Sequence, residues 1–169
     1  MGMYYSIEVK NNNELGYIDF PESLSYFFEQ VDAYEQKSIS HQIEKILNID
    51  LSLFQKTYHP EMESNERTND FWIDIEELLN KLMEFKSKMK TNKSYFSKVL
   101  LNPKDDREKY INLSSEKIVN YQKENPLSLY PINNGIITEE ILMDSIIKLI
   151  MTLKKLKDKG EKKIRLVYS

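Results

Sequence analysis

This chain contains no cysteine and only four glycines, and both features exclude several kinds of functional site. Without cysteine there is no disulfide, cysteine-ligated zinc, iron–sulfur cluster or thiol catalysis. The glycines are isolated from one another, so they form neither a phosphate-cradling loop nor a dinucleotide fingerprint. No serine occupies a G-x-S-x-G elbow. We therefore expect no cofactor.

Long apolar runs are also missing. The most apolar stretch, 141–156, is interrupted by Asp144, Lys148, Lys154 and Lys155. It is therefore not expected to span a membrane. The N-terminus lacks the basic-then-apolar order of a signal peptide. Together with the absence of cysteine, these features predict a cytoplasmic protein.

The length of 169 residues and the composition, 40% hydrophobic and 30% charged, are typical of one globular domain. A domain of this size buries about two-thirds of its unfolded surface. No repeat or linker interrupts the chain, so we expect a single domain over 1–169. A second methionine, Met3, indicates that residues 1–2 are a cloning leader.

Charge is distributed unevenly along the chain. Residues 1–77 contain 16 Asp/Glu and 5 Lys/Arg, a balance of −11. Residues 78–169 contain 11 and 19, a balance of +8, and the two halves sum to the net charge of −3. Such asymmetry bears on the choice of partner rather than on the fold.

Both ends of the chain show the alternating pattern of half-buried strands. We expect a small antiparallel sheet from residues 3–10, 14–20 and 162–168, with the first two strands forming a hairpin. A third strand is expected because an isolated hairpin is marginally stable. The predicted fold is therefore α+β and mostly α.

Most of the remaining chain shows helical spacing of apolar residues, which predicts five or six helices packed on the sheet. Residues 50–58 fit either a short helix or an extended segment. The helices are expected from Pro21 through Tyr34, from Ser38 or Ser40 through Leu47, from Asp70 to Met89 after a cap at Thr68 or Asn69, from Ser94 to Pro103, from Ser114 or Ser115 to before Pro126, and from Thr138 to Gly160.

The last of these helices has the clearest boundaries. Thr138 is a suitable N-cap, and Glu139 and Glu140 favour the positive end of the helix dipole. Gly160 is placed to end the helix. Because this helix is apolar around most of its circumference, we expect it at the centre of the fold.

Two predicted helices carry outward acidic faces around an apolar side chain. Ile73 is expected to point away from the core. Such faces suit a partner protein with a basic surface, although Lys81 and Lys88 interleave with the acids as on an ordinary solvated surface. The candidate partner-binding residues are Glu22, Tyr26, Glu29, Asp32, Asp70, Ile73, Asp74 and Glu77.

The most concrete functional hypothesis is a protein-binding inhibitor. We expect a bacterial immunity or antitoxin-type protein that neutralises a basic toxin such as a nuclease. An acidic inhibitor can occupy a phosphate-binding groove and associate quickly by electrostatic steering. No motif identifies a particular inhibitor family, and enzyme activity is the less favoured interpretation.

Two alternatives belong to other classes of protein. A carboxylate-based hydrolase would use Glu35 or the loop His59–Glu63. A nucleic-acid-associated protein would use residues 86–98, where five lysines accompany the pair Tyr95-Phe96. We expect no metal site at His59 or at His41, because neither is surrounded by a closed ligand set.

Overall fold

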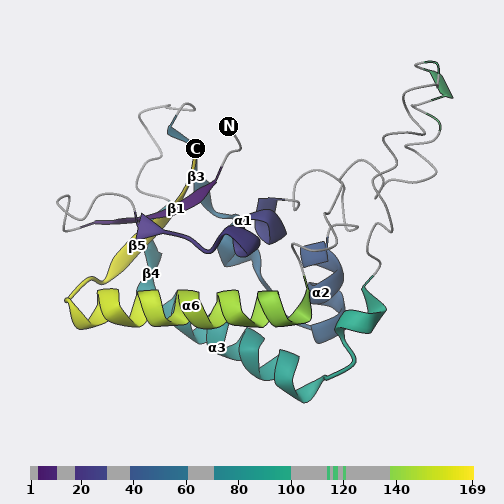
Figure 1. The fold of residues 1–169 in the computed structure, drawn as a ribbon. Coiled ribbons are helices and arrows are strands. Elements are labelled where there is room, and N and C mark those ends of the chain that lie inside the picture. The colour runs from purple at the N-terminus through teal and green to yellow at the C-terminus, as the bar shows by residue number, and fades with distance from the viewer. Residues whose placement is uncertain are drawn as a thin grey trace.

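The computed structural model describes residues 4–10, 18–29, 39–60, 71–99, 114, 116–117, 120 and 138–169. In these residues, α-helices lie along one face of a small sheet (Figure 1). The strands are β1 (Tyr5–Val9), β2 (Ile18–Asp19), β3 (Thr57–Tyr58), β4 (Ile73–Asp74) and β5 (Lys163–Tyr168). The α-helices are α1 (Glu22–Glu29), α2 (Ile39–Leu47), α3 (Ile75–Thr91) and α6 (Glu139–Asp158), and the 3-10 helices are η2 (Ser52–Gln55) and η4 (Phe96–Lys98).

β5 is the central strand of the sheet. The strand order is β2-β1-β5-β3, and β4 also pairs with β5. Ile7 of β1 pairs with Ile18 of β2 on one side and with Leu166 of β5 on the other. The expected N-terminal hairpin with a C-terminal third strand is therefore confirmed, and the start of β1 lies beside the end of β5 (Figure 1).

One strand pair contradicts the prediction of a wholly antiparallel sheet. β3 runs parallel to β5, with Tyr58 opposite Val167. A parallel pair needs a long crossover between its strands, and α3 and α6 both lie between β3 and β5 in the sequence. Residues 50–58, which fitted either a helix or an extended segment, contain both η2 and β3.

The prediction of five or six helices is not matched, because the described residues form four α-helices and two 3-10 helices. The described part of the segment after Ser94, which ends at Val99, forms the short helix η4. The segment between Ser114 and Pro126 lies almost wholly outside the described residues. The expected caps Thr68 and Asn69 of the long helix also lie outside them.

The long helix α3 begins later than predicted. Ile73 pairs with Ile164 of β5, so its backbone is extended and cannot belong to a helix. Asp74 then acts as the N-cap, because its Oδ1 accepts a hydrogen bond from the amide of Glu76 at 2.9 Å.

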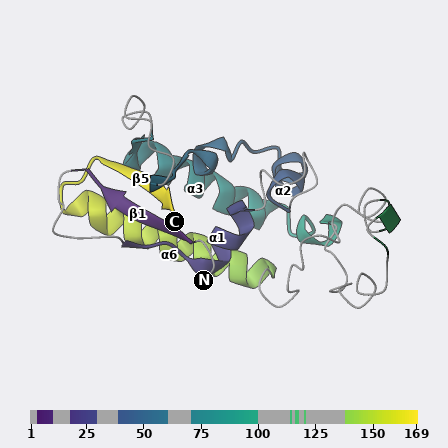
Figure 2. The ribbon, with the colours of Figure 1, turned by 90° about the horizontal axis from the view of Figure 1, so that it is seen from above.

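α6 is not enclosed on all sides, although its apolar pattern had predicted this: one side is buried, whereas Asp144, Lys148, Met151 and Lys155 are exposed. It packs against α3 beneath the sheet (Figure 2). Its buried side carries a row of residues from Leu142 to Leu156. Thr138 caps it by accepting a hydrogen bond from the amide of Ile141, which confirms the predicted N-terminus. The opposite end is confirmed as well, because Gly160 follows the helix with a positive φ of 88°.

The face of the sheet turned away from α6 carries a cluster of rings and charges around Arg165. Its guanidinium carbon lies 3.9 Å from the centroid of the Tyr58 ring and 4.9 Å from that of Trp72. Its Nε donates a hydrogen bond to the Glu8 carboxylate of the neighbouring strand. These contacts join β1, β3, β5 and the residue before β4 on the outer face.

Candidate functional site

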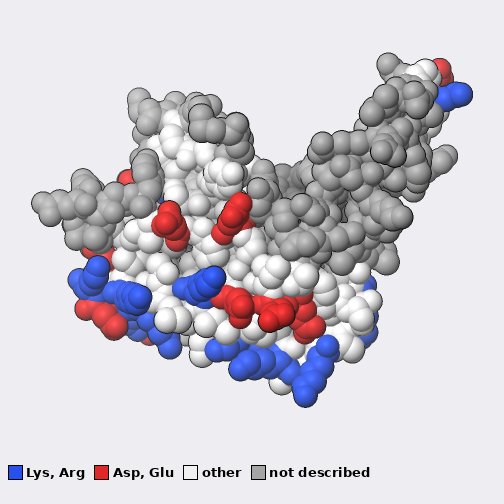
Figure 3. Space-filling view, in the orientation of Figure 1, with Lys and Arg blue, Asp and Glu red and all other residues white. Residues whose placement is uncertain are grey.

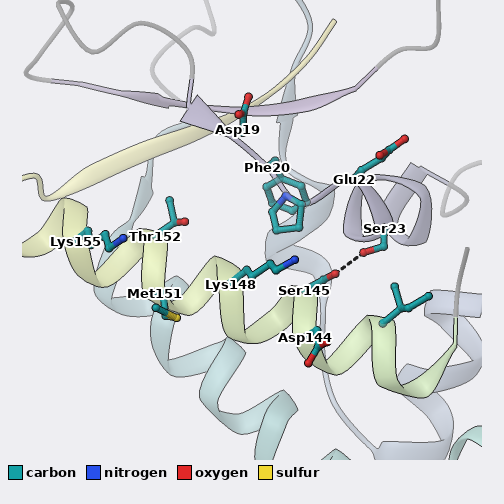
Figure 4. A pocket seen from close by; sticks show the side chains of 12 residues that line it. Asp19, Phe20, Glu22, Ser23, Asp144, Ser145, Lys148, Met151, Thr152 and Lys155 are labelled. Carbon is teal, nitrogen blue, oxygen red and sulfur yellow. Dashed lines mark hydrogen bonds between the residues drawn. The ribbon is translucent and has the colours of Figure 1, made fainter.

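An open groove of about 700 Å³ separates α6 from the corner where β2 leads into α1 (Figure 4). Residues 19–23 form one side of it. α6 forms the other side, with lining residues between Ile141 and Lys155. Met151 contributes an apolar side chain that is 54% exposed. The groove therefore combines apolar and charged surface.

The side of the groove formed by residues 19–23 is fixed by backbone hydrogen bonds. The carbonyl of Pro21 accepts from the amides of Leu24 and Ser25, each at 3.0 Å. A proline suits this position because its φ matches a helix and the first helical amides have no intrahelical acceptor. Ser25 Oγ then accepts a hydrogen bond from the amide of Tyr5 at 3.0 Å, so α1 is tied to β1.

α1 and α6 are joined directly at the groove. The hydroxyls of Ser23 and Ser145 form a hydrogen bond between the two helices (Figure 4). Ser145 is one of the few buried polar residues on α6, and this bond satisfies its hydroxyl. The bond therefore fixes how closely α1 approaches α6, and with it the width of the groove.

Charged side chains surround the groove. Asp19 and Glu22 are exposed on the β2–α1 side, and Asp144, Lys148 and Lys155 are exposed on α6. Within the described residues none of these five side chains makes an ion pair. Acidic side chains gather on both sides of the groove, and basic ones gather toward the C-terminal end of α6 (Figure 3). Their charges are therefore available to a partner.

The α6 side of this groove was not predicted from the sequence, although a signal for it exists. Asp144, Lys148, Met151 and Lys155 recur at helical spacing and form one stripe on a helix that is otherwise largely apolar. A polar stripe on a central helix marks the one side that the core does not cover.

The predicted partner-binding residues whose side chains the structure describes lie in different places. Glu22 lines the groove, whereas Asp74 lines a separate pocket at the start of α3 and Glu77 is exposed one residue beyond Glu76. Tyr26 and Glu29 belong to α1, but their side chains lie outside the described residues, as do Asp32 and Asp70 entirely.

The prediction that Ile73 points away from the core is wrong. Its side chain is only 3% exposed and belongs to the main apolar cluster. The helical wheel placed it among the acids, but β4 is extended, so alternate residues point to opposite faces. Ile73 therefore faces inward beside Ile164, whereas Asp74 faces solvent.

One of the two aromatic residues in the basic segment 86–98 is not accessible for stacking. Tyr95 is completely buried in the core, and this burial, with a smaller effect of Glu139, raises the pKa of its hydroxyl. Phe96 is partly buried against the same core. Lys88 is paired with Glu84 at 3.2 Å. The expected platform for stacking nucleic-acid bases is therefore not available at Tyr95.

The residues expected for a carboxylate enzyme lie mostly outside the described part of the chain. This applies to Glu35 and to the carboxylates of the loop His59–Glu63. The imidazole of His59 packs edge-on against Tyr168, with ring centroids 5.2 Å apart, and its Nε2 lies 3.3 Å from Thr57 Oγ1. In this position His59 contributes to packing at the edge of the sheet.

The residues near His41 also have structural contacts. The carboxylate of Glu44 accepts a hydrogen bond from the amide of Leu51 at 2.7 Å, which holds the end of α2 to the next segment. Among the described residues, no three His, Asp or Glu side chains come close enough together to hold one metal ion.

No protein-family model, curated protein or solved structure matches this chain. No helix in the part of the chain that the structure describes is both long and apolar enough to cross a membrane.

Proposed function

We propose that this protein binds the basic surface of a partner protein in the groove between α1 and α6. The finer proposal is an inhibitor of the immunity or antitoxin type, which neutralises a basic toxin such as a nuclease. One observation carries the proposal: Asp19, Glu22 and Asp144 are exposed around the groove and form no ion pair with the residues that the structure describes.

The apolar lining of the groove supports a protein partner. Ile141 and Met151 contribute apolar surface to the lining of the groove. Protein interfaces combine apolar with polar and charged surface in this way. Methionine also adapts its shape to different partner surfaces. The apolar residues would supply contact area, and the acids would supply selection for a basic partner.

The excess of acid supports the inhibitory role. A toxin that acts on nucleic acid presents basic residues where phosphates bind, and carboxylates can occupy the same positions. The acidic half of the chain attracts such a surface over a distance, which raises the association rate. Lys148 and Lys155 weaken this attraction. They also favour a partner that has acidic side chains opposite the C-terminal end of α6.

The binding proposal is tested with a short peptide of alternating lysines and leucines, and with a matched peptide in which glutamates replace the lysines. In NMR titrations of the full chain, the lysine peptide should shift signals of Ile141, Asp144 and Met151. The glutamate peptide should leave them unchanged. Equal binding of both peptides, or shifts only outside the groove, would contradict the proposal.

The inhibitor proposal is tested on the product of a toxin gene adjacent to the gene for this chain. Equimolar addition of this protein should abolish the toxin's activity. A variant with Glu22→Lys and Asp144→Lys should inhibit much more weakly, because charge reversal at the groove repels a basic surface. Undiminished activity of the toxin in the presence of excess protein would overturn the inhibitory role.

A further inference from the structure

A second pocket, of about 340 Å³, lies where α3 begins and the chain turns from α6 into β5. Residues 160–162 line one side, Asp74 and Glu76 line another, and Lys157 completes it. Glu161 is only 6% exposed, although it carries a carboxylate. Its Oε2 is closed off from solvent and has no hydrogen-bond partner in the described part of the chain.

Among the described residues, the neighbouring charges leave Glu161 without a counter-ion. Asp74 is engaged as the N-cap of α3, where its Oδ1 accepts from the Glu76 amide. Lys157 lies 3.0 Å from the Glu76 carboxylate and forms an ion pair with it. Lys162 is exposed and forms no ion pair within the described residues. A buried carboxylate without a partner is unfavourable, and a cation that reaches it is bound more strongly than at the surface.

The pocket discriminates among three classes of ligand. An anion would meet three carboxylates, Asp74, Glu76 and Glu161, against two lysines. A metal ion needs several ligands within a short radius, and the described residues contain no such group of acids. An organic cation with several separated donors fits best, and the planar guanidinium of arginine has five.

The positive end of α3 does not reverse this preference. A helix N-terminus carries roughly half a positive charge. The carboxylates of the N-cap Asp74 and of Glu76 in the first turn more than offset that charge. The remaining carboxylate, Glu161, is then the group that lacks a partner.

We propose that this pocket receives an arginine side chain of the partner protein, with Glu161 as the acceptor of its guanidinium through the carboxylate oxygen other than the closed-off Oε2. The inference rests on the proposed function in one respect, that the partner is a basic protein. The pocket would then be a second binding point on the α3 side of α6, separate from the groove. It would select a partner that carries an arginine at this point.

The test uses NMR titration of the full chain with a short peptide that carries one arginine. The control peptide carries citrulline, which has nearly the same shape but no charge. The arginine peptide should shift the amides of Ile75, Glu76 and residues 160–162, and the citrulline peptide should bind at least about tenfold more weakly, because a charge-assisted hydrogen bond is lost. Equal binding of the two peptides would overturn the proposal.

Glu161→Gln separates a binding role from a structural one. The variant keeps the shape of the side chain and removes its charge, so it should bind the arginine peptide at least about tenfold more weakly while its Tm stays the same or rises. Asp158→Asn, an exposed acid outside both pockets, is the matched control and should bind normally. A fall in Tm for Glu161→Gln, or undiminished binding, would contradict the proposal.

The same titrations distinguish this inference from the proposed function. If the lysine–leucine peptide shifts the groove while the arginine peptide leaves the pocket signals unchanged, the pocket proposal fails alone. If the arginine peptide binds at the pocket while the lysine–leucine peptide leaves the groove unchanged, the groove proposal fails alone.

Discussion

At the scale of single residues, the turn from α6 into β5 depends on one backbone conformation. Gly160 has φ +88°, and its amide donates a hydrogen bond to the carbonyl of Lys157 at 2.9 Å. Side chains with a Cβ rarely adopt such a φ, whereas glycine does so readily. Because an added Cβ would meet nothing within 4 Å, the cost of a substitution here comes from the backbone alone.

Gly160→Ala should lower the free energy of unfolding by about 1–2 kcal/mol, because alanine is strained in the left-handed region. Gly160→Asn should cost less, since asparagine tolerates this region better. Chemical denaturation of the three proteins measures the difference. An alanine variant as stable as the original would show that the turn does not require a positive φ.

A second residue-scale prediction concerns Glu84 on α3. The hydrogen bond from Lys81 at 2.8 Å, helped by Lys88 at 3.2 Å, holds the pKa of the Glu84 carboxyl below its usual value of 4.5. A lowered pKa in the folded state contributes stability above pH 4.5, and this is lost as the pH falls through the folded pKa. Because 40% of the Glu84 side chain is exposed, solvent screens the contribution to less than about 1 kcal/mol.

Glu84→Gln should therefore lower the free energy of unfolding at pH 7 by a few tenths of a kcal/mol up to about 1 kcal/mol. The difference from the original protein should shrink as the pH falls below 4.5, and it should also shrink in high salt. Urea denaturation across this pH range measures it. A difference that grows toward low pH would contradict the sign of the pKa shift.

At the scale of whole elements, the helix ends that depend on nearby residues were predicted correctly from the sequence. Thr138 and Gly160 were found because a cap and a helix-ending glycine act within a few residues. The start of α3 was missed because Ile73 is extended by pairing with Ile164 of β5, far along the chain. A helical pattern read from one segment contains no information about such a distant pair.

Ile73→Ala tests this difference between pattern and structure. If Ile73 is buried in β4, the substitution should lower the free energy of unfolding by about 2–5 kcal/mol, because it leaves a cavity in the core. Met83→Ala on α3 is the matched control, since Met83 is 46% exposed and should change stability by no more than about 0.5 kcal/mol. Equal effects of the two substitutions would support the outward orientation that the helical pattern predicted.

The candidate site was partly predictable for the same physical reason. Glu22 was identified because acidity is visible in the sequence, and it does line the groove. Its neighbours Asp144 and Lys148 were missed because they come from α6, which the pattern placed at the centre of the core. A groove formed by two helices far apart in the chain requires their packing, and composition does not determine that packing.

At the scale of the whole molecule, the charged and the apolar residues of the groove have different roles in the proposed binding. Acids around the groove act over a distance of about 10 Å at 0.1 M salt. They therefore act mainly on the association rate. Met151 acts only on contact, so it influences how long a complex lasts. These two effects can be separated by kinetic measurements on the same complex.

Association of the lysine–leucine peptide, measured by stopped flow at low and high salt, provides the last prediction. Glu22→Lys with Asp144→Lys should slow association at low salt about tenfold or more and flatten its salt dependence, because both changes reverse the steering field at the groove. Met151→Ala should instead speed dissociation with little change in the association rate. Asp158→Lys, outside both pockets, controls for the change in net charge. If it slows association as much per charge as the groove variant does, net charge alone steers the peptide and the groove has no special role.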